Sequence, residues 1–395
     1  MDERAFIDTT FLEKFRWSLP WLLRYPFWRM REFAARLSES SEQQHLIFLV
    51  ANHFEPGVGA EGVARVESWS KLARNTGNAL RDHDGTPFRH TNFFPAEQYD
   101  QAVLEALSSL QVDGYGEVEI HLHHGVTHPD TAENTRRMLE DFRDVLAEKH
   151  GCLSRDGSSP LPRYAFVHGN WALANSAGGR FCGVDNEMKI LEETGCYADF
   201  TLPSVPYQSQ VPRINAIYEC GYPFSEARPH RAGPSVRVGE PPKLPIIFTG
   251  PLVFDWTRRK HGLPIPRIED GALAQNYPLR LHRFENWRDA RISVLGAQDW
   301  VFIKLYSHGF FDWDQDAMIG EQMKRFMAEV LELAERTGKN KIHFASAREA
   351  FNMVMAAVDG CKGDPNTYRD YRLRQIMKGV AGSTADIDRT AAMIG

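Results

Sequence analysis

The segment EVEIHLHHGVTH, residues 117–128, decides the fold class. It begins as an apolar run with the alternation of a β-strand and ends in histidines where the strand reaches a turn. Apolar runs of this kind recur along the chain, separated by segments with the spacing of amphipathic helices. We expect strands at 45–51, 88–94, 117–123, 163–168, 197–202, 245–249, 300–306 and 341–345.

The intervening segments place apolar residues on one helical face. The two clearest sets are Met138, Phe142, Val145 and Leu146, and Met323, Phe326, Met327, Val330 and Leu331. Alternating strands and helices favour a parallel sheet, and seven or eight strands is a barrel-sized number. The sequence therefore predicts an α/β fold, a distorted (β/α) barrel of seven or eight strands, with an N-terminal helical extension.

Composition divides the chain into three parts. Residues 1–44 form a helical, aromatic and basic extension, residues 45–360 the barrel, and residues 361–395 a C-terminal helix with a loose tail. Residues 206–244 are rich in Pro, Gly and Arg and show no sustained period. We interpret them as a long excursion on a barrel loop that helps to build or cover the site.

Within the extension, residues 11–37 combine aromatic and leucine side chains with six Lys or Arg and only two Glu. This composition is typical of an amphipathic helix that lies on a membrane surface. The alternative is a helix packed on the barrel, and Pro20 and Pro26 would divide it into short pieces. The sequence contains no run of roughly 18 apolar residues that could span a bilayer.

The bulk composition limits the classes of partner and compartment. The 395 residues carry a net charge of -6 without a basic block, so we expect no nucleic-acid partner and a small or saccharide substrate. The five cysteines are widely spaced and form no CxxC pair, which favours a reducing compartment over a disulfide framework. Because the N-terminus has no secretory signal, we expect a cytoplasmic protein, or one held at the membrane periphery through residues 11–37.

Chemically capable side chains follow the predicted strands. Seven of the 15 histidines lie at or just after strand ends, and Glu55 follows the first strand. In a parallel barrel these ends meet on one face, where neutral imidazoles and a carboxylate can bind a divalent metal. The candidate metal ligands are His53, Glu55, His121, His123, His124 and His128.

Within residues 117–128 the histidine ligands can pair in two ways. Strand alternation puts His121 and His123 on one face, while His124 and His128 have the i, i+4 spacing of one helical turn. Either pair, or both, would bind the metal. Glu55 would supply a hard oxygen ligand or act as the base.

The segment HGNWAL, residues 168–173, carries candidate substrate-binding groups. His168, Asn170 and Trp171 follow a strand and suit the wall of a sugar site, because an indole stacks on a pyranose face and an amide bonds hydroxyls. A buried core position is the alternative for Trp171. We therefore expect these three residues to contact a saccharide.

The segment FIKLYSHGFFDWD, residues 302–314, carries candidate catalytic groups. Its strand ends in Tyr306, a candidate for substrate binding, and His308 follows before an aromatic and acidic loop. A general acid on this loop would serve hydrolysis. Asp199, within the fifth strand, is a further candidate on the same face.

At these residues the sequence resembles the polysaccharide deacetylase family, also called the NodB-homology or carbohydrate esterase type, in a divergent branch. The resemblance covers roughly residues 45–355, and its specific part is the order of the motifs HFEPG, EIHLHHGVTH, FVHGNWALANS, CYADFTLPS and KLYSHG. It implies a barrel of the glycoside hydrolase and deacetylase type. It also implies a metal, usually zinc, held by one carboxylate and two histidines.

The family further implies an aspartate base that activates water against an N-acetyl carbonyl and a late histidine that protonates the leaving amine. Carried onto this sequence, the resemblance makes Glu55 the carboxylate ligand and two of the four histidines within 121–128 the imidazole ligands. His308 becomes the acid, and Asp199 orients it or contacts the substrate.

The chain departs from the family at its first motif. Where the family presents two acidic residues close together, this sequence has Asn52, His53, Phe54 and Glu55, and an asparagine cannot accept the proton. Either Glu55 is the base and histidines alone bind the metal, or His53 takes one of the two roles, or hydrolysis is lost and the barrel binds a saccharide. The arginine of the family's substrate-wall motif is also absent from residues 166–170.

We therefore expect a metal-dependent hydrolase of carbon–nitrogen bonds that removes an acyl group, most simply N-acetyl, from an amino sugar or glycan precursor. The alternative is a catalytically inactive, deacetylase-like barrel that binds saccharide in a surface-polysaccharide pathway. A phosphoesterase on a similar barrel would need a basic phosphate cradle, which the sequence does not clearly show.

Overall fold

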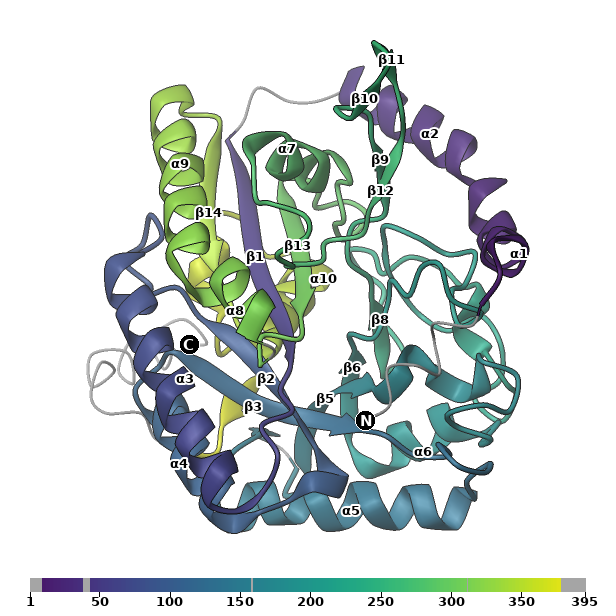
Figure 1. Cartoon of the computed structure of the whole chain (residues 1–395), viewed down its shortest axis with the longest axis vertical. Helices are drawn as coiled ribbons and strands as arrows, with labels where there is room; N and C mark the ends of the chain where they lie inside the picture. The colour runs from purple at the N-terminus through teal and green to yellow at the C-terminus, as the bar shows by residue number, and fades with distance from the viewer. Residues whose placement is uncertain (1–8, 38–42, 158, 311, 378–395) are drawn as a thin grey trace.

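The structure is a computed structural model that describes residues 9–37, 43–157, 159–310 and 312–377. Its centre is one large, mostly parallel β-sheet, with helices around the outside (Figure 1). The path through the sheet runs β13 (Trp300–Ser307), β1 (Gln44–His53), β2 (His90–Pro95), β3 (Gly116–Leu122), β5 (Pro162–His168), β6 (Cys196–Asp199), β8 (Ile246–Phe248) and β7 (Ile217–Tyr218). Along this path, only β7 runs antiparallel to its neighbour.

All eight strands expected from the apolar runs are present, with bounds that differ by a few residues. The last of them, β14 (Asn340–Phe344), pairs in parallel with β1. In β1, every residue from Leu46 to His53 is buried, which explains why a continuous apolar run predicted it. The local pattern was sufficient here because both faces of the sheet are covered.

Helices connect most of the parallel strands and pack on the sheet. They are α3 (Gly59–Ala79), α4 (Gln101–Val112), α5 (Ala132–Glu148), α6 (Glu187–Thr194), α7 (Leu281–Asp289), α8 (Asp312–Ile319), α9 (Glu321–Thr337) and α10 (Ala347–Val358). In α5, Phe142 and Leu146 of the predicted apolar face are buried, while Met138 and Val145 are half-buried. α10 is buried along its whole length and joins the core around β1.

The α/β class is confirmed, and within the described residues no strand pairing joins β7 or β8 to β13. In the part of the chain that the structure describes, the sheet therefore does not close into the expected barrel through strand pairing. Residues of the segment 249–273 lie beside β13, where a further strand would be needed to close it. Tyr306 of β13 forms a parallel bridge with Ala272. The backbone of Gly250 approaches β13 so closely that a Cβ there would lie 2.8 Å from the carbonyl oxygen of Lys304. The interval 206–244 contains only β7 and the turn η5 (Pro229–Arg231) as regular structure, in keeping with the long loop that we expected.

Smaller pairings lie at the periphery. They are β9 (Val253–Asp255) with β12 (Arg267–Glu269), β10 (Arg259–Lys260) with β11 (Leu263–Pro264), and β4 (Ser154–Asp156) with β15 (Leu373–Gln375).

The C-terminal segment differs from the helix that we expected after Cys361. Residues 361–377 form the turn η6 (Pro365–Tyr368) and the strand β15. The carbonyl oxygen of Leu373 accepts hydrogen bonds from Arg348 and Asn352 of α10, which holds this segment extended against the core. The rest of the predicted tail, residues 378–395, lies outside the described residues, as do residues 1–8 and 38–42 of the predicted extension.

The N-terminal extension consists of two helices, α1 (Phe11–Leu22) and α2 (Tyr25–Leu37), on the flank of the molecule near β9 and β12 (Figure 1). A capping box between Thr10 and Glu13 begins α1. Pro20 lies inside α1, so the break that we expected there falls after Leu22 instead. Among the described residues, no helix is long and apolar enough to cross a membrane.

Candidate metal centre

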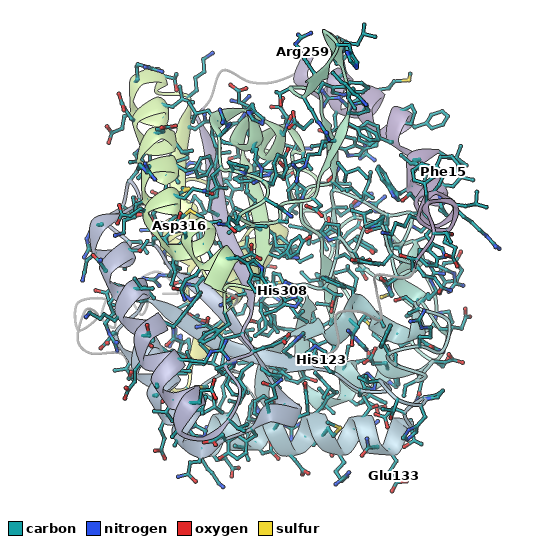
Figure 2. All side chains as sticks on the ribbon, viewed as in Figure 1. Phe15, His123, Glu133, Arg259, His308 and Asp316 are labelled. Carbon is teal, nitrogen blue, oxygen red and sulfur yellow. The ribbon has the colours of Figure 1, made fainter. Side chains whose placement is uncertain are left out.

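The carboxyl ends of β1, β3 and β13 bring together His53, Glu55, His121, His123 and His308. Because β1 pairs in parallel with β13, and β2 lies in parallel between β1 and β3, these strand ends lie at the same edge of the sheet. Figure 2 shows His123 and His308 near the middle of the molecule as it is viewed there. The convergence at strand ends that the sequence predicted is therefore present for these five side chains.

Two imidazoles aim at one carboxylate oxygen. The Nε2 atoms of His121 and His123 each lie 3.6 Å from Oε1 of Glu55. One donor atom each from His53, Glu55 and His121 lies within 4.8 Å of the other two. Tetrahedral zinc with bonds of about 2.0–2.2 Å separates its ligand atoms by about 3.3–3.6 Å. The His121–Glu55 and His123–Glu55 separations match this spacing, and His53 lies within 4.8 Å of the ligand atoms of His121 and Glu55.

The other ring nitrogen of each imidazole has its own partner. Nδ1 of His121 lies 2.7 Å from the carbonyl oxygen of Val167, and Nδ1 of His123 lies 2.6 Å from Oε1 of Glu97. A carbonyl oxygen and an ionised carboxylate only accept, so both Nδ1 atoms donate and both Nε2 atoms present lone pairs. The buried Nε2 of His121 has no hydrogen-bond partner, as expected of a ligand atom that awaits a cation. Such outer partners commonly orient metal-binding histidines.

Electrostatics keep these groups in the protonation states that a cation requires. Burial alone would raise the pKa of the Glu55 carboxyl, but positive charge on His121 and His123 outweighs burial and lowers the pKa to about 2, and a metal ion bound by these rings would act in the same direction. Burial lowers the pKa of His308 to about 4, and burial together with His308 holds the pKa of His53 well below its usual value. The site therefore contains the Glu55 carboxylate beside neutral His53 and His308 near pH 7.

The imidazole rings of His53 and His308 lie next to each other in the site. The ring of His53 lies 4.4 Å from that of His308 and 4.9 Å from that of His121, measured between ring centroids. The neighbouring Asn52 is buried, donates to Oδ1 of Asn92 at 3.2 Å and accepts from the N–H of Gly309 at 3.0 Å. Both ends of its amide are thus committed to holding β1, β2 and the loop after β13 together.

A cavity of about 210 Å³ adjoins His308. Trp171, Tyr207, Tyr306 and Asp314 line it together with small side chains. The Trp171 and Tyr207 rings stack with centroids 5.3 Å apart and planes at 12°, so they form one flat aromatic wall. Trp171 therefore lines a cavity and is not a core residue, and Tyr306 reaches the same cavity.

Several predicted site residues lie elsewhere. Asp199 is buried, and its two carboxylate oxygens accept from the hydroxyl and the N–H of Thr201, so it organises the strand end and shows no contact with His308. Asn170 is half-buried and does not line the cavity. His128 is exposed on the loop after β3 and bonds Thr127, so the i, i+4 pair of His124 and His128 does not form a site.

His124 and His168 face away from Glu55. They belong to a separate buried group with Cys182 and Glu187. Neither Cys182 nor Glu187 could be singled out from the sequence, because Cys182 lies in an irregular connection and Glu187 begins α6, so neither follows a strand end. Glu97, in the turn η2 (Ala96–Gln98) after β2, was also missed, although a carboxylate directly after a strand end is the signal used for Glu55.

Two further groups of potential ligands share His343: one contains His45 and Asp364, the other Asp82 and Asp84. The ammonium group of Lys341 pairs with both Asp84 and Asp364 at 2.5 Å. A cation is thus already present between these carboxylates, and this region needs no metal.

No protein-family profile matches the sequence, and no curated protein matches it significantly.

Proposed function

We propose that the protein is a metal-dependent hydrolase that removes an acyl group, N-acetyl in the simplest case, from an amino sugar or glycan precursor. The observation that carries the proposal is the convergence of His121 and His123 on one oxygen of Glu55, with both Nδ1 atoms held by acceptors. This set of two imidazoles and one carboxylate suits zinc. When bound, the metal would polarise the acyl carbonyl and make water more acidic.

The remaining groups supply proton transfer. His53 and His308 are neutral and adjacent, so one ring can accept a proton from the attacking water while the other delivers a proton to the leaving nitrogen. His308 also lines the cavity and is therefore the better placed of the two to reach the leaving group. Asn52 takes no part, because its amide is committed to Asn92 and Gly309.

The cavity favours a small, ring-shaped substrate. Its volume of about 210 Å³ lies below the roughly 300–1,000 Å³ of sites for drug-sized ligands. The stacked rings of Trp171 and Tyr207 offer a flat apolar wall against which a sugar face would pack. Asp314, in α8, also lines the cavity and offers a carboxylate to hydroxyl groups. We therefore favour a single acylated sugar unit over a long polymer.

The proposed fold is an open version of the (β/α) barrel seen in deacetylases and glycoside hydrolases. The parallel order of the strands and the site at their carboxyl ends support it. The bridge between Tyr306 and Ala272 supports it as well, because residues of the 249–273 segment occupy the position of the strands that would complete the ring.

The second candidate function is saccharide binding without hydrolysis. It is favoured by Asn52, which stands where an acidic base would be expected and cannot accept a proton. One experiment separates the two functions: metal content and acetate release from N-acetylated amino sugars, measured for the unaltered protein, His123→Ala and the matched control His128→Ala.

For the hydrolase we expect acetate release by the unaltered protein and by His128→Ala, and loss of both turnover and one equivalent of metal in His123→Ala. Bound saccharide with metal but no acetate would establish the binding function instead. Unchanged metal content in His123→Ala would overturn the site itself.

We also propose that α1 and α2 lie on an anionic membrane surface. Their outward side exposes a set of large apolar residues: Phe11, Leu12, Phe15, Leu19, Leu23, Phe27, Met30 and Phe33. Phe11 is 86% and Phe27 73% exposed, and Phe15 lies at the outer edge of the molecule in Figure 2. The exposed Arg16, Arg24, Arg29 and Arg31 lie on the same helices and the turn between them, and their charge complements anionic lipid headgroups.

The inward side of these helices is packed, so the outward face is held in place. Trp21 is buried against Phe254, with ring centroids 5.8 Å apart, and the Tyr25 hydroxyl accepts from the N–H of Phe254 at 3.2 Å. A docked pair of helices would thus keep its apolar face turned outward before any lipid is met. This arrangement is that of an interfacial anchor.

Co-sedimentation with vesicles tests this proposal. We expect binding to phosphatidylserine-containing vesicles, weaker binding to phosphatidylcholine alone, and loss of binding in the double variant Phe15→Ser and Phe27→Ser. Val126→Ser, which changes an exposed apolar residue far along the chain, is the control. A different result is that the unaltered protein self-associates without binding vesicles, while the double variant stays monomeric. That result would make the exposed apolar side of α1 and α2 a contact with a second copy of the chain.

A further inference from the structure

A second cluster of side chains that could hold a metal ion lies apart from the candidate metal centre. His124 follows β3, His168 ends β5, Cys182 lies in the connection 169–186, and Glu187 begins α6. All four are buried, and one ligand atom from each lies within 4.8 Å of the other three. None of them contributes to the group around Glu55.

The ligand atoms of this cluster lie at separations equal to or slightly below those of a tetrahedral zinc site. Nε2 of His124 lies 3.0 Å from Nε2 of His168 and 2.9 Å from Oε1 of Glu187. Nε2 of His168 lies 3.3 Å from the same Oε1, and Sγ of Cys182 lies 3.7 Å from Oε2 of Glu187. Zinc with bonds of about 2.0 Å to nitrogen and oxygen and about 2.3 Å to sulfur separates its ligands by about 3.3–3.7 Å.

The outward-facing atoms of the two histidines are held by acceptors. Nδ1 of His124 lies 3.0 Å from Oδ2 of Asp130, and Nδ1 of His168 bonds the carbonyl oxygen of Gly169. Each Nδ1 therefore donates, and the two Nε2 lone pairs face each other across 3.0 Å. Two lone pairs this close repel unless a proton or a metal cation lies between them.

The two acidic ligands are oriented in the same way. The N–H of Ala174 donates to Oε2 of Glu187 at 2.6 Å, and the N–H of Val184 donates to Sγ of Cys182 at 3.4 Å. Backbone donors of this kind stabilise negative charge on a carboxylate and a sulfur. The cluster thus offers two ring nitrogens, a carboxylate and a sulfur to a central cation.

The connection that carries Cys182 has little regular structure to hold it in place. Between β5 and α6 it contains only short 3-10 turns, and Asn170, Trp171, Ala174, Asn175 and Phe181 have positive φ values between 47° and 61°. Such backbone conformations persist only where surrounding contacts impose them. A cross-link between Cys182 in the loop and His168 of β5, Glu187 of α6 and His124 just after β3 would impose them.

We propose that His124, His168, Cys182 and Glu187 form a second metal site, structural in role, that takes zinc. Four protein ligands complete its coordination shell, and burial of all four excludes water, which distinguishes it from the more open site at Glu55. Because Trp171 lies in the same connection, this metal would also fix the aromatic wall of the substrate cavity. The proposal does not depend on the hydrolase activity.

The first test uses the unaltered chain loaded with cobalt(II) in place of zinc. A cysteine thiolate bound to cobalt(II) gives an intense near-ultraviolet charge-transfer band, whereas imidazole and carboxylate ligands alone do not. We expect this band in the unaltered protein and in His123→Ala, which alters only the other site. Absence of the band in the unaltered protein would overturn the proposal and would mean that a proton joins the two imidazoles.

The second test uses metal counting with a matched cysteine control. We expect two equivalents of zinc in the unaltered protein, one in Cys182→Ser, and two in Cys196→Ser, whose buried sulfur lies outside the cluster. Two equivalents retained in Cys182→Ser would also overturn the proposal. If the unaltered protein releases no acetate but shows the cobalt–thiolate band, the proposed hydrolase is rejected and the second metal site stands. Failure of one proposal can therefore be distinguished from failure of the other.

Discussion

The side-chain oxygen of Asn52 accepts a hydrogen bond of 3.0 Å from the N–H of Gly309. This bond joins the end of β1 to the loop that follows β13, one residue after His308. Asn52 is buried and also donates to Asn92, so a residue whose identity raised doubt about catalysis has a structural task at the same edge of the sheet.

Replacement of Asn52 by alanine should destabilise the protein and displace His308. The buried N–H of Gly309 and Oδ1 of Asn92 would each lose a partner, at about 1–3 kcal/mol for a buried group. We expect a loss of about 2 kcal/mol or more in the free energy of unfolding, measured with urea. Asn78→Ala, which removes an exposed hydrogen bond from Tyr115, should cost much less. Equal losses in the two variants would contradict this assignment.

Glu97 should control metal affinity although it does not contact the metal. Its carboxylate holds Nδ1 of His123 at 2.6 Å, and loss of such an outer partner typically lowers affinity about 10–100-fold. We expect Glu97→Gln to weaken zinc binding at the Glu55 site by this factor in competition with a chelating dye. The exposed Glu105→Gln is the control. Unchanged affinity in Glu97→Gln would show that His123 needs no partner to bind.

His308 should be needed for turnover and not for metal. General acid–base catalysis typically contributes about 10²–10⁴-fold to rate, so we expect His308→Ala to lower kcat within this range. Zinc content should stay at the level of the unaltered protein, because Glu55, His121 and His123 remain in place. Loss of zinc in His308→Ala would instead make His308 a ligand.

Glu119 should make the protein less stable as pH rises. It is buried with its carboxyl bound to Tyr197 and to the N–H of Ala165, and burial raises its pKa from 4.5 to about 8. Between these values the native state keeps a proton that the unfolded state has lost, so this contribution to stability is present at low pH and lost toward pH 8.

The slope from this one group is at most about 1.4 kcal/mol per pH unit. Glu119→Gln stays neutral at every pH, and we expect its free energy of unfolding to fall less steeply than that of the unaltered protein between pH 5 and pH 8. The measurement is urea denaturation at several pH values. Parallel curves for the two proteins would show that Glu119 is ionised in the native state.

Local periodicity explains how much could be predicted from the sequence. A buried parallel strand needs continuous apolar side chains, and this made all eight main strands recognisable. Strand alternation also placed His121 and His123 on the same face, and the structure directs both toward Glu55. By contrast, the i, i+4 reading of His124 and His128 assumed a helical turn, whereas Gly125 has φ 63° and the chain continues as an exposed loop.

The sequence by itself determined the α/β class, the strands and the histidine and carboxylate side chains that follow them, because these can be recognised from side-chain patterns over fewer than ten neighbouring positions. Only the tertiary structure decided which of these residues act together. His123 and His124 are adjacent in the chain, yet one faces Glu55 and Glu97 while the other faces His168 and Glu187. Successive side chains leave a strand end in different directions, and their partners arrive from elements that are distant in sequence.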